Sequence, residues 1–407
     1  MGMWSRLVWI ATWLALPACG DEGCGATRAT GESRGKPAAS VGESARPPGD
    51  EPERASAAAP RAEPGLELPA GLRVAAGAAH TCRVTERGEV GCEGSNRFGQ
   101  LGRADRPRGP EARQDDPVRV KGLEDVASLT AGAFHTCALR RDGSVVCWGH
   151  GGYGLLGEGG AGGDDVPSPK PVKGLKDAVA LTAGEGFTCA RTTRGTARCW
   201  GRNDHAQLGR GHRGAPEGPG DVAGLQNVAQ LAAGRDHACA LLDDGAVRCW
   251  GLAIDGQVGA RAGGDVAARP VRVPLPEPAV EVAAGGYHTC ARFETGEVRC
   301  FGSNDSGQLG TGGGGDPSDR RPEPASMAGV DDARALAAGA RFTCVLRRTG
   351  HVLCAGYNGD GQLGDGTTTL RKRPVPVDGV SDATSLTAGA TRVCAVPTTG
   401  TPQCWGR

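Results

Sequence analysis

Pairs of cysteines separated by ten residues recur seven times along this chain. A glycine follows the first cysteine of every pair by six residues, as in a β-hairpin whose three-residue loop ends in the left-handed conformation that glycine adopts without steric cost. Counting outward from such a loop places the two cysteines opposite each other at a non-hydrogen-bonded position, with about 4.5 Å between Cα atoms, within disulfide range. We therefore predict seven local disulfides: Cys82–Cys92, Cys137–Cys147, Cys189–Cys199, Cys239–Cys249, Cys290–Cys300, Cys344–Cys354 and Cys394–Cys404.

The clearest copy has the loop Arg141-Asp142-Gly143, which pairs Leu139 with Val145 and the cysteines three steps out. Closing a ring of roughly eleven residues stabilises the fold by somewhat under about 3 kcal/mol. Such bonds matter here because glycine accounts for 69 of 407 residues and aromatic residues for only 4%, which limits apolar burial. The alternative is that these are reduced cysteines of the core.

The glycine that opens each copy recurs every 50 to 55 residues, a period typical of propeller blades. Each hairpin is followed by a second phrase, as in residues 96–102 and 358–364, and then by a proline-led apolar strand, as in residues 117–120 and 374–377. We predict an all-β fold, a seven-bladed β-propeller with four-stranded blades, over residues 65–407. The last copy ends at Arg407 without its outer strand, so we expect residues 66–72 to supply that strand and to close the ring from the N-terminal side.

The phrase Gly-x-x-His-Thr-Cys-Ala-Leu, followed by Asp-Gly, Cys-Trp-Gly and Asn-x-x-Gly-Gln-Leu-Gly, resembles the regulator of chromosome condensation repeat family over residues 66–407. This resemblance implies a seven-bladed propeller. It extends to bacterial propellers that inhibit β-lactamases through one face, and to the exchange factor of the GTPase Ran, which would imply nucleotide exchange. The histidine position holds Phe187, Phe342 and Arg392 in three copies, which we interpret as decay of the repeat.

Residues 1–19 contain a short basic start and an apolar run too short to span a bilayer, ending at Cys19. They resemble a bacterial lipoprotein signal in which Cys19 is lipidated, although Pro17 departs from the usual small residue and leaves ordinary secretory cleavage as the alternative. Residues 20–64 are rich in Ala, Pro, Gly and charge, so we expect a disordered tether. Cys24 is then left over: it is free, bonds a partner, or pairs with Cys19 if that residue is not lipidated.

Export to a bacterial cell envelope, with a lipid anchor in a membrane, agrees with paired cysteines, because disulfides persist in oxidising compartments. Secretion is the alternative localisation. The net charge is zero, from 46 basic and 46 acidic residues, which disfavours a nucleic-acid partner. We expect a monomer.

We expect no metal, no cofactor and no catalytic residue. His80, His135, His237 and His288 share one position of the repeat, and equivalent positions stand around a ring instead of converging on one ion. Residues 358–362 resemble part of a calcium loop, but Thr369 occupies the twelfth position, where a carboxylate is needed. We interpret the histidines as hydrogen-bonded structural residues and the calcium-like segment as a turn.

The leading hypothesis for function is a membrane-anchored, non-enzymatic recognition scaffold that binds a protein or glycan through one face of the propeller. Residues between the opening glycine and the histidine position vary from copy to copy and fall in a ring near one end of the axis. One alternative is an extracytoplasmic enzyme with an active site in long loops at the channel, such as residues 102–117 or 310–324; another is an exchange-factor-like regulator of a small GTPase. The partner-binding candidates, chosen for hot-spot chemistry, are Phe134, Arg235, Asp236, Tyr287 and Arg341.

Overall fold

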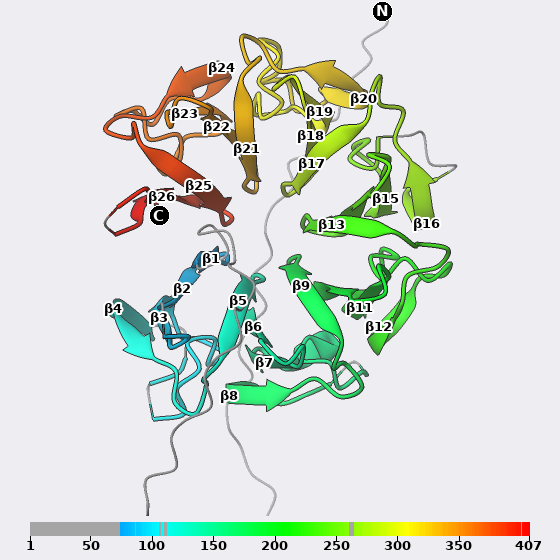
Figure 1. The fold of residues 1–407 in the computed structure, drawn as a ribbon, viewed down its shortest axis with the longest axis vertical. Helices are drawn as coiled ribbons and strands as arrows, with labels where there is room; N and C mark the ends of the chain where they lie inside the picture. Colours follow the sequence, from blue (N-terminus) through cyan, green and yellow to red (C-terminus); the bar gives the residue numbers. More distant parts are fainter. Residues whose placement is uncertain are drawn as a thin grey trace, which may run out of the picture. The chain divides into compact units, whose positions relative to one another are not determined.

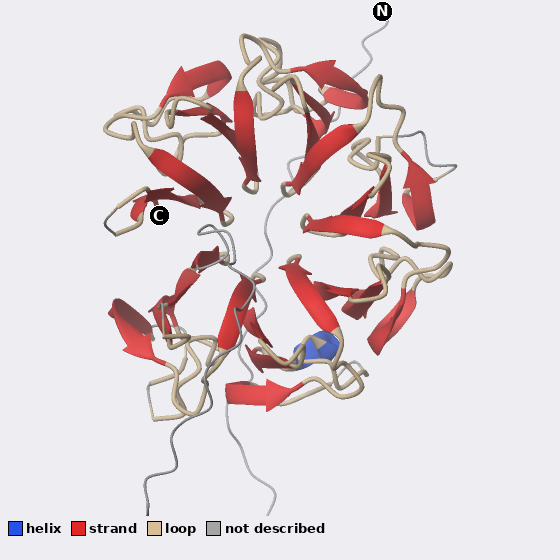
Figure 2. Ribbon diagram, in the orientation of Figure 1, coloured by secondary structure: helices blue, strands red, loops and turns tan. Residues whose placement is uncertain are grey.

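A computed structural model describes residues 74–407 except 86, 106, 110–111, 161, 260–263 and 400. Seven antiparallel sheets stand radially around a central axis, confirming the predicted seven-bladed propeller (Figures 1 and 2). We number the blades 1 to 7 in chain order, so that blade 1 contains β1–β4 and blade 7 contains β25–β27. The predicted signal, lipidation at Cys19, the fate of Cys24, the tether and the closing strand at residues 66–72 all lie outside the described residues.

Each blade runs outward from the axis in chain order, and neighbouring strands pair. The strands nearest the axis are β1 (Val74–Ala76), β5 (Val126–Ala131), β9 (Ala178–Ala183), β13 (Val228–Ala233), β17 (Ala279–Ala284), β21 (Ala333–Ala338) and β25 (Ala383–Ala388). The second strands are β2 (His80–Val84), β6 (His135–Arg140), β10 (Phe187–Thr192), β14 (His237–Leu242), β18 (His288–Phe293), β22 (Phe342–Arg347) and β26 (Arg392–Pro397). The third strands are β3 (Val90–Ser95), β7 (Val145–Gly149), β11 (Ala197–Asn203), β15 (Val247–Leu252), β19 (Val298–Ser303), β23 (Val352–Gly356) and β27 (Gln403–Gly406).

The described outer strands are β4 (Arg113–Arg119), β8 (Val166–Pro171), β12 (Gly214–Asp221), β16 (Val266–Arg272), β20 (Arg320–Ser326) and β24 (Arg371–Pro376). A short 3₁₀ turn, η2 (Gly152–Gly154), lies between β7 and β8. No helix in the described part of the chain is both long and apolar enough to cross a membrane.

The hairpin between the second and third strands has the predicted register. Cys137 is opposite Cys147, Leu139 is opposite Val145, and Gly143 has a φ of 80°, in the left-handed region. All seven predicted disulfides are present, with 4.0 to 4.1 Å between paired Cα atoms. Every paired cysteine except Cys404 is completely buried, so the bonds lie in the core of each blade instead of on its surface.

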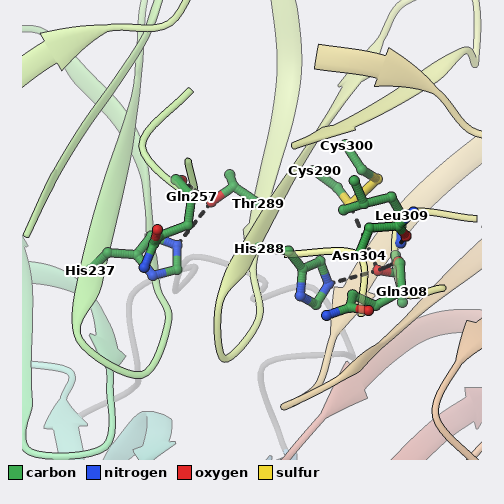
Figure 3. The surroundings of a disulfide bond; sticks show 10 residues. His237, Gln257, His288, Thr289, Cys290, Cys300, Asn304, Gln308 and Leu309 are labelled. Atoms are coloured by element: carbon green, nitrogen blue, oxygen red, sulfur yellow. Dashed lines mark hydrogen bonds between the residues drawn. A yellow bond between two sulfur atoms is a disulfide. The ribbon is translucent and has the colours of Figure 1, made fainter. Parts of the chain in front are cut away.

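The contact between one blade and the next, which we call a seam, is built around the histidine position of the repeat. At four seams the histidine Nε2 lies 2.8 to 2.9 Å from the threonine Oγ1 of the following blade. Figure 3 shows this arrangement for His237, Thr289 and Gln257, and it shows His288 on the side of the Cys290–Cys300 disulfide. The predicted structural role of these histidines is therefore confirmed at the seams His80–Thr136, His135–Thr188, His237–Thr289 and His288–Thr343.

These histidines are neutral. Thr343 Oγ1 donates its proton to the carbonyl of Gln308, so it accepts a hydrogen bond from Nε2–H of His288. The opposite nitrogen, Nδ1, is buried without a partner. Burial lowers the pKa of His80 and His288 to about 4 and that of His135 and His237 to about 3.

Two further seams replace this polar pair with an apolar one. Phe187 packs in one buried cluster with Ala238 of the next blade, and Phe342 packs with Val393. Phenylalanine therefore occurs where the next blade carries a small apolar residue, and histidine occurs where it carries threonine. Our interpretation of Phe187 and Phe342 as decay of the repeat is corrected: each change is matched across its seam.

The seventh seam joins blade 7 to blade 1 and uses charge. Arg392, at the histidine position, lies 3.4 Å from the carboxylate of Glu93, which occupies the position of Trp148 in blade 2. Arg83 donates to the same carboxylate at 2.8 Å. The backbone N–H of Ala390 also donates to the carbonyl of Gly77, so the two ends of the ring meet directly.

Candidate functional site

The loops between the first and second strands of all seven blades surround a cavity of about 390 Å³ on the propeller axis. Its wall is a ring of Ala-Gly steps, one from each blade. Glycine is required in this ring: a Cβ at Gly132 would lie 2.2 Å from Cε1 of His135 and 2.6 Å from the carbonyl oxygen of Gly184 in the next blade. The seams therefore fix the width of the cavity. Residues with larger side chains around it are Phe134, Glu185, Arg235, Tyr287 and Arg341.

Four of the five partner-binding candidates line this cavity: Phe134, Arg235, Tyr287 and Arg341. Phe134 is 38% exposed, whereas the phenylalanines of the blade cores are completely buried. Asp236 is different, because it is 4% exposed and is not part of the lining.

Asp236 instead supports the arginines above it. Its carboxylate lies 3.4 Å from Arg235 Nε and 3.7 Å from Arg202 Nη1. Arg235 also pairs with Glu185 at 2.7 Å, and its guanidinium carbon lies 5.4 Å from the centre of the Tyr287 ring. Burial raises the pKa of Tyr287, so its hydroxyl stays protonated at neutral pH. Blades 3, 4 and 5 thus share one connected cluster at the cavity rim.

Next to this cluster along the rim, Arg341 of blade 6 forms an ion pair with Asp305 of blade 5. Burial alone would raise the pKa of Asp305, but hydrogen bonds from Gln308 and Arg341 hold it below its ordinary value. This carboxylate is charged at neutral pH and keeps Arg341 over the cavity.

Sequence reasoning missed that Phe134 belongs to a second group of residues on this face, most of which lie in the loops that follow the third strands. The Phe98 ring lies 5.1 Å from Phe134 and 4.6 Å from His150, and His150 lies 6.2 Å from Tyr153, measured between ring centres. A guanidinium covers each end: Arg97 lies 5.1 Å from the centre of the Phe98 ring and Arg202 lies 5.5 Å from that of Tyr153. We call these six residues the aromatic band: Arg97, Phe98, Phe134, His150, Tyr153 and Arg202.

One signal in the sequence could have found the band. Counted from the third-strand glycine, Phe98 and Tyr153 occupy the same position of successive repeats, where later repeats carry His205, Asp255 and Ser306. Aromatic residues therefore accumulate in the loops of the first blades. Their contact with Phe134, which comes from a different loop, becomes visible only in three dimensions.

The described residues do not offer a metal centre: no group of three or more His, Cys, Asp or Glu side chains among them is placed to hold an ion. The calcium-like segment is a structural turn, as predicted. Asn358 Oδ1 accepts from the backbone of Leu363, and its amide nitrogen donates to Asp365 and Thr367.

In the long loops considered for an active site, several of the described carboxylates are held in ion pairs or by hydrogen bonds: Asp115 pairs with Arg113, and Asp316 accepts from Ser318. Asp105 binds Arg103 and Lys121, and Asp319 binds Arg321 at 2.8 Å. The cavity lining contains one carboxylate residue, Glu185, which pairs with Arg235. The site is suited to contact and burial of a partner.

Comparison with known proteins agrees with this architecture. Residues 88–139, 142–191, 195–241, 244–292 and 295–346 match the profile of the regulator of chromosome condensation (RCC1) repeat. A second profile of the same repeat matches residues 126–155, 178–207, 228–257, 279–308 and 333–362.

Two curated proteins illustrate the relationship. The ultraviolet-B receptor UVR8 of Arabidopsis thaliana is 30% identical over 302 residues, covering 72% of this chain and 55% of the receptor. The human E3 ubiquitin-protein ligase HERC2 is 31% identical over 249 residues, covering 61% of this chain and 4% of the ligase. The chain thus spans about half the length of the first relative and a small part of the second.

Among solved structures, yeast RCC1 (Prp20) bound to Kap60 superposes with a TM-score of 0.67 at 22% identity and with 78% of each chain covered. That likeness concerns the fold.

Proposed function

This chain belongs to the regulator of chromosome condensation repeat family, and from that premise we propose that its propeller is a non-enzymatic recognition scaffold that binds a protein partner through the axial face. The axial face consists of the cavity lining and the aromatic band. Propellers of this repeat family occur in a receptor, a ubiquitin ligase and a protein crystallised with Kap60, so binding is a common use of the fold.

One observation carries the proposal: several large apolar and arginine side chains are exposed on the axial face. Phe134 and Tyr153 are 38% and 50% exposed, and Arg235 and Arg341 line the axial cavity together with Phe134. Aromatic residues and arginine are enriched at the hot spots of protein interfaces: aromatic rings bury much area with few rotatable bonds, and the planar guanidinium donates several hydrogen bonds. Leaving such side chains in water is unfavourable unless a partner covers them.

The seven buried disulfides indicate an oxidising, extracytoplasmic compartment. We further propose that the protein is exported and anchored by a lipid on Cys19, with residues 20–64 as a tether between the membrane and the propeller. An exchange-factor role on a cytosolic GTPase is incompatible with that compartment. A glycan partner is the alternative outcome of the binding test below.

The test is capture of a partner from native envelope extract by the full chain with its disulfides intact, identified by mass spectrometry. Changing Phe134 and Tyr287 together to Ala should lower the captured amount at least tenfold, because it removes two aromatic side chains from the cavity rim. Val280→Ala is the matched control, since Val280 is 38% exposed but does not line the cavity.

Equal capture by the double variant and the control would overturn the axial face as the binding surface. Capture of glycan fragments in place of a protein would support the alternative that the axial face binds a glycan. Labelling with a lipid precursor, and its loss on Cys19→Ser, tests the anchor separately.

A further inference from the structure

We propose that the aromatic band is a binding site for an acidic peptide segment of the partner, in which carboxylates flank an aromatic or large aliphatic side chain. The proposal rests on the recognition function above and specifies the chemistry of the ligand. It follows from the continuity of the band, the sign of the charges on it, and the unusual loop that presents Tyr153.

The band is continuous across three blades. Phe98 comes from blade 1, Phe134 and Tyr153 come from blade 2, and Arg202 comes from blade 3. Successive rings lie 4.6 to 6.2 Å apart and meet at tilted or edge-on angles, so they form one surface instead of isolated side chains. A surface of this extent suits a peptide of several residues better than a single small molecule.

The loop of blade 2 departs from its counterparts in a way that exposes Tyr153. Gly151 and Leu155 replace the asparagine and glutamine that brace this loop in blade 1, where Asn96 and Gln100 hold the backbone. Tyr153 has a φ of 60°, a conformation that costs of order 1 kcal/mol or more for a residue with a side chain. Its ring is nevertheless half in solvent. A strained backbone that presents an exposed ring points to a contact made outside the chain.

The two charged groups stacked on the rings are arginines, but Arg202 is already paired with carboxylates, including Asp236 at 3.7 Å. Arg97 and Arg202 place their guanidinium groups over Phe98 and Tyr153. The neighbouring carboxylates are already engaged: Asp165 accepts from His150 Nδ1 at 2.8 Å, and Asp204 pairs with Arg202 at 2.5 Å.

Arg97 is the cation best placed for a ligand. It is exposed, and no carboxylate of the described residues lies within ion-pair distance of it. An arginine resting on an aromatic ring is held in position before binding, so little entropy is lost when it pairs with a ligand carboxylate. Charge complementarity therefore favours an acidic ligand.

The anchor side chain of such a peptide has a place to enter. Phe134 belongs both to the aromatic band and to the lining of the axial cavity, and the cavity wall beside it is a ring of alanine and glycine. An aromatic or aliphatic side chain seated against Phe134 buries apolar surface at about 25 cal/mol per Å². Carboxylates next to it in the peptide then reach Arg97.

The probe is a displayed library of random twelve-residue peptides, selected on the immobilised full chain and then counted by sequencing. We expect enrichment of peptides with Asp or Glu within two residues of Trp, Phe, Tyr or Leu. Recovered peptides, labelled with fluorescein, should bind at least tenfold more weakly to Arg97→Glu and to Tyr153→Asn, as measured by fluorescence anisotropy. Asparagine tolerates the left-handed backbone, so Tyr153→Asn removes the ring without adding strain.

Two variants serve as matched controls. Arg87→Glu makes the same charge change in the turn between β2 and β3, and Tyr357→Ala removes another exposed tyrosine, in blade 6. Both should bind the peptides as the unchanged protein does. Binding should also weaken as NaCl rises from 50 to 500 mM, because the ligand charge is part of the recognition.

The inference is overturned if the selected peptides lack acidic residues, if nothing is enriched over a blocked surface, or if Arg97→Glu and the control Arg87→Glu bind alike. Binding of chito-oligosaccharide that is lost in Tyr153→Asn would replace the peptide by a glycan. If the peptide experiment fails but capture of a partner still depends on Phe134 and Tyr287, the proposed function remains intact. Loss of that dependence would remove the function itself.

Discussion

Six seams of this propeller join neighbouring blades through buried residues, whereas the seventh joins them through charged residues. At the six seams between blades that are consecutive in the chain, neighbouring blades meet through His–Thr hydrogen bonds or through packing of Phe on an apolar residue. The residues involved are buried. Where blade 7 meets blade 1, Arg392 and Arg83 share the carboxylate of Glu93, and both arginine side chains remain about one-third exposed. The internal seams exclude water, whereas the closing seam keeps contact with it.

At the six internal seams, the residue at the histidine position is matched to the residue that it contacts in the next blade, and not to the motif of its own blade. Burying the Nε2–H donor of a seam histidine without an acceptor costs free energy, so the histidine and the threonine occur together. The closing seam joins the two ends of the fold, and its charged pair tolerates hydration because the arginines are part-exposed. The predictions below test this difference between buried and hydrated seams.

The largest effect of any single substitution is expected from a mismatch at an internal seam. Phe187→His places an imidazole against Ala238, where no hydroxyl is available, and should lower the free energy of unfolding by about 3 kcal/mol. Adding Ala238→Thr supplies the acceptor found at the other seams and should recover at least half of that loss. Denaturant unfolding of both single variants and the double variant gives the coupling energy. Purely additive effects would contradict matching across the seam.

Acid should weaken the His–Thr seams next. The four seam histidines have folded pKa values of about 3 to 4, below the unfolded value near 6.5, so the unfolded state binds more protons below that pH. Their stabilising contribution is complete above pH 6.5 and is lost as the pH falls toward 4, by roughly 2 kcal/mol for each histidine at pH 5.

Denaturant midpoints at pH 7.5, 6 and 5 measure this decline. The double variant His288→Phe with Thr343→Val, which copies the natural Phe342–Val393 seam, should show a shallower decline than the unchanged protein. An identical pH profile for the two proteins would exclude His288 as a source of the acid sensitivity.

The smallest effect belongs to the closing seam. Glu93→Gln removes the shared carboxylate, but Arg83 and Arg392 can turn toward water, so we expect a loss of about 1 kcal/mol. That loss should shrink in 1 M NaCl because salt already screens the pair. The mismatch at Phe187 should be insensitive to salt. Equal salt dependence of the two variants would remove the distinction between hydrated and buried seams.

The sequence was sufficient for the architecture because each decisive signal is local. The cysteine spacing and the loop glycine lie within eleven residues of one another, and together they specify the hairpin register seen at Cys137 and Cys147. The blade count followed from repetition of that unit. The seam pairing was not recognised because its two members lie more than 50 residues apart, as Phe187 and Ala238 do, in different copies of the repeat.

The site was accessible to sequence reasoning only in part. Comparing the same position of each repeat found Phe134, Arg235, Tyr287 and Arg341, which the structure places around one cavity. It did not reveal that Asp236 is buried, because that depends on Arg202 and Arg235 covering it. The aromatic band was missed because its rings come from two kinds of loop, whose approach is set by how the blades pack.

The disulfides join residues only ten positions apart, and this has a consequence for how such a chain can arise. Each blade carries its covalent bond within a short stretch of coding sequence, so duplicating that stretch copies the bond as well. A newly added unit finds its own partner cysteine first, because the shortest loop closes at the smallest entropic cost. The lineage can therefore gain or lose blades without rewiring the bonds of those already present.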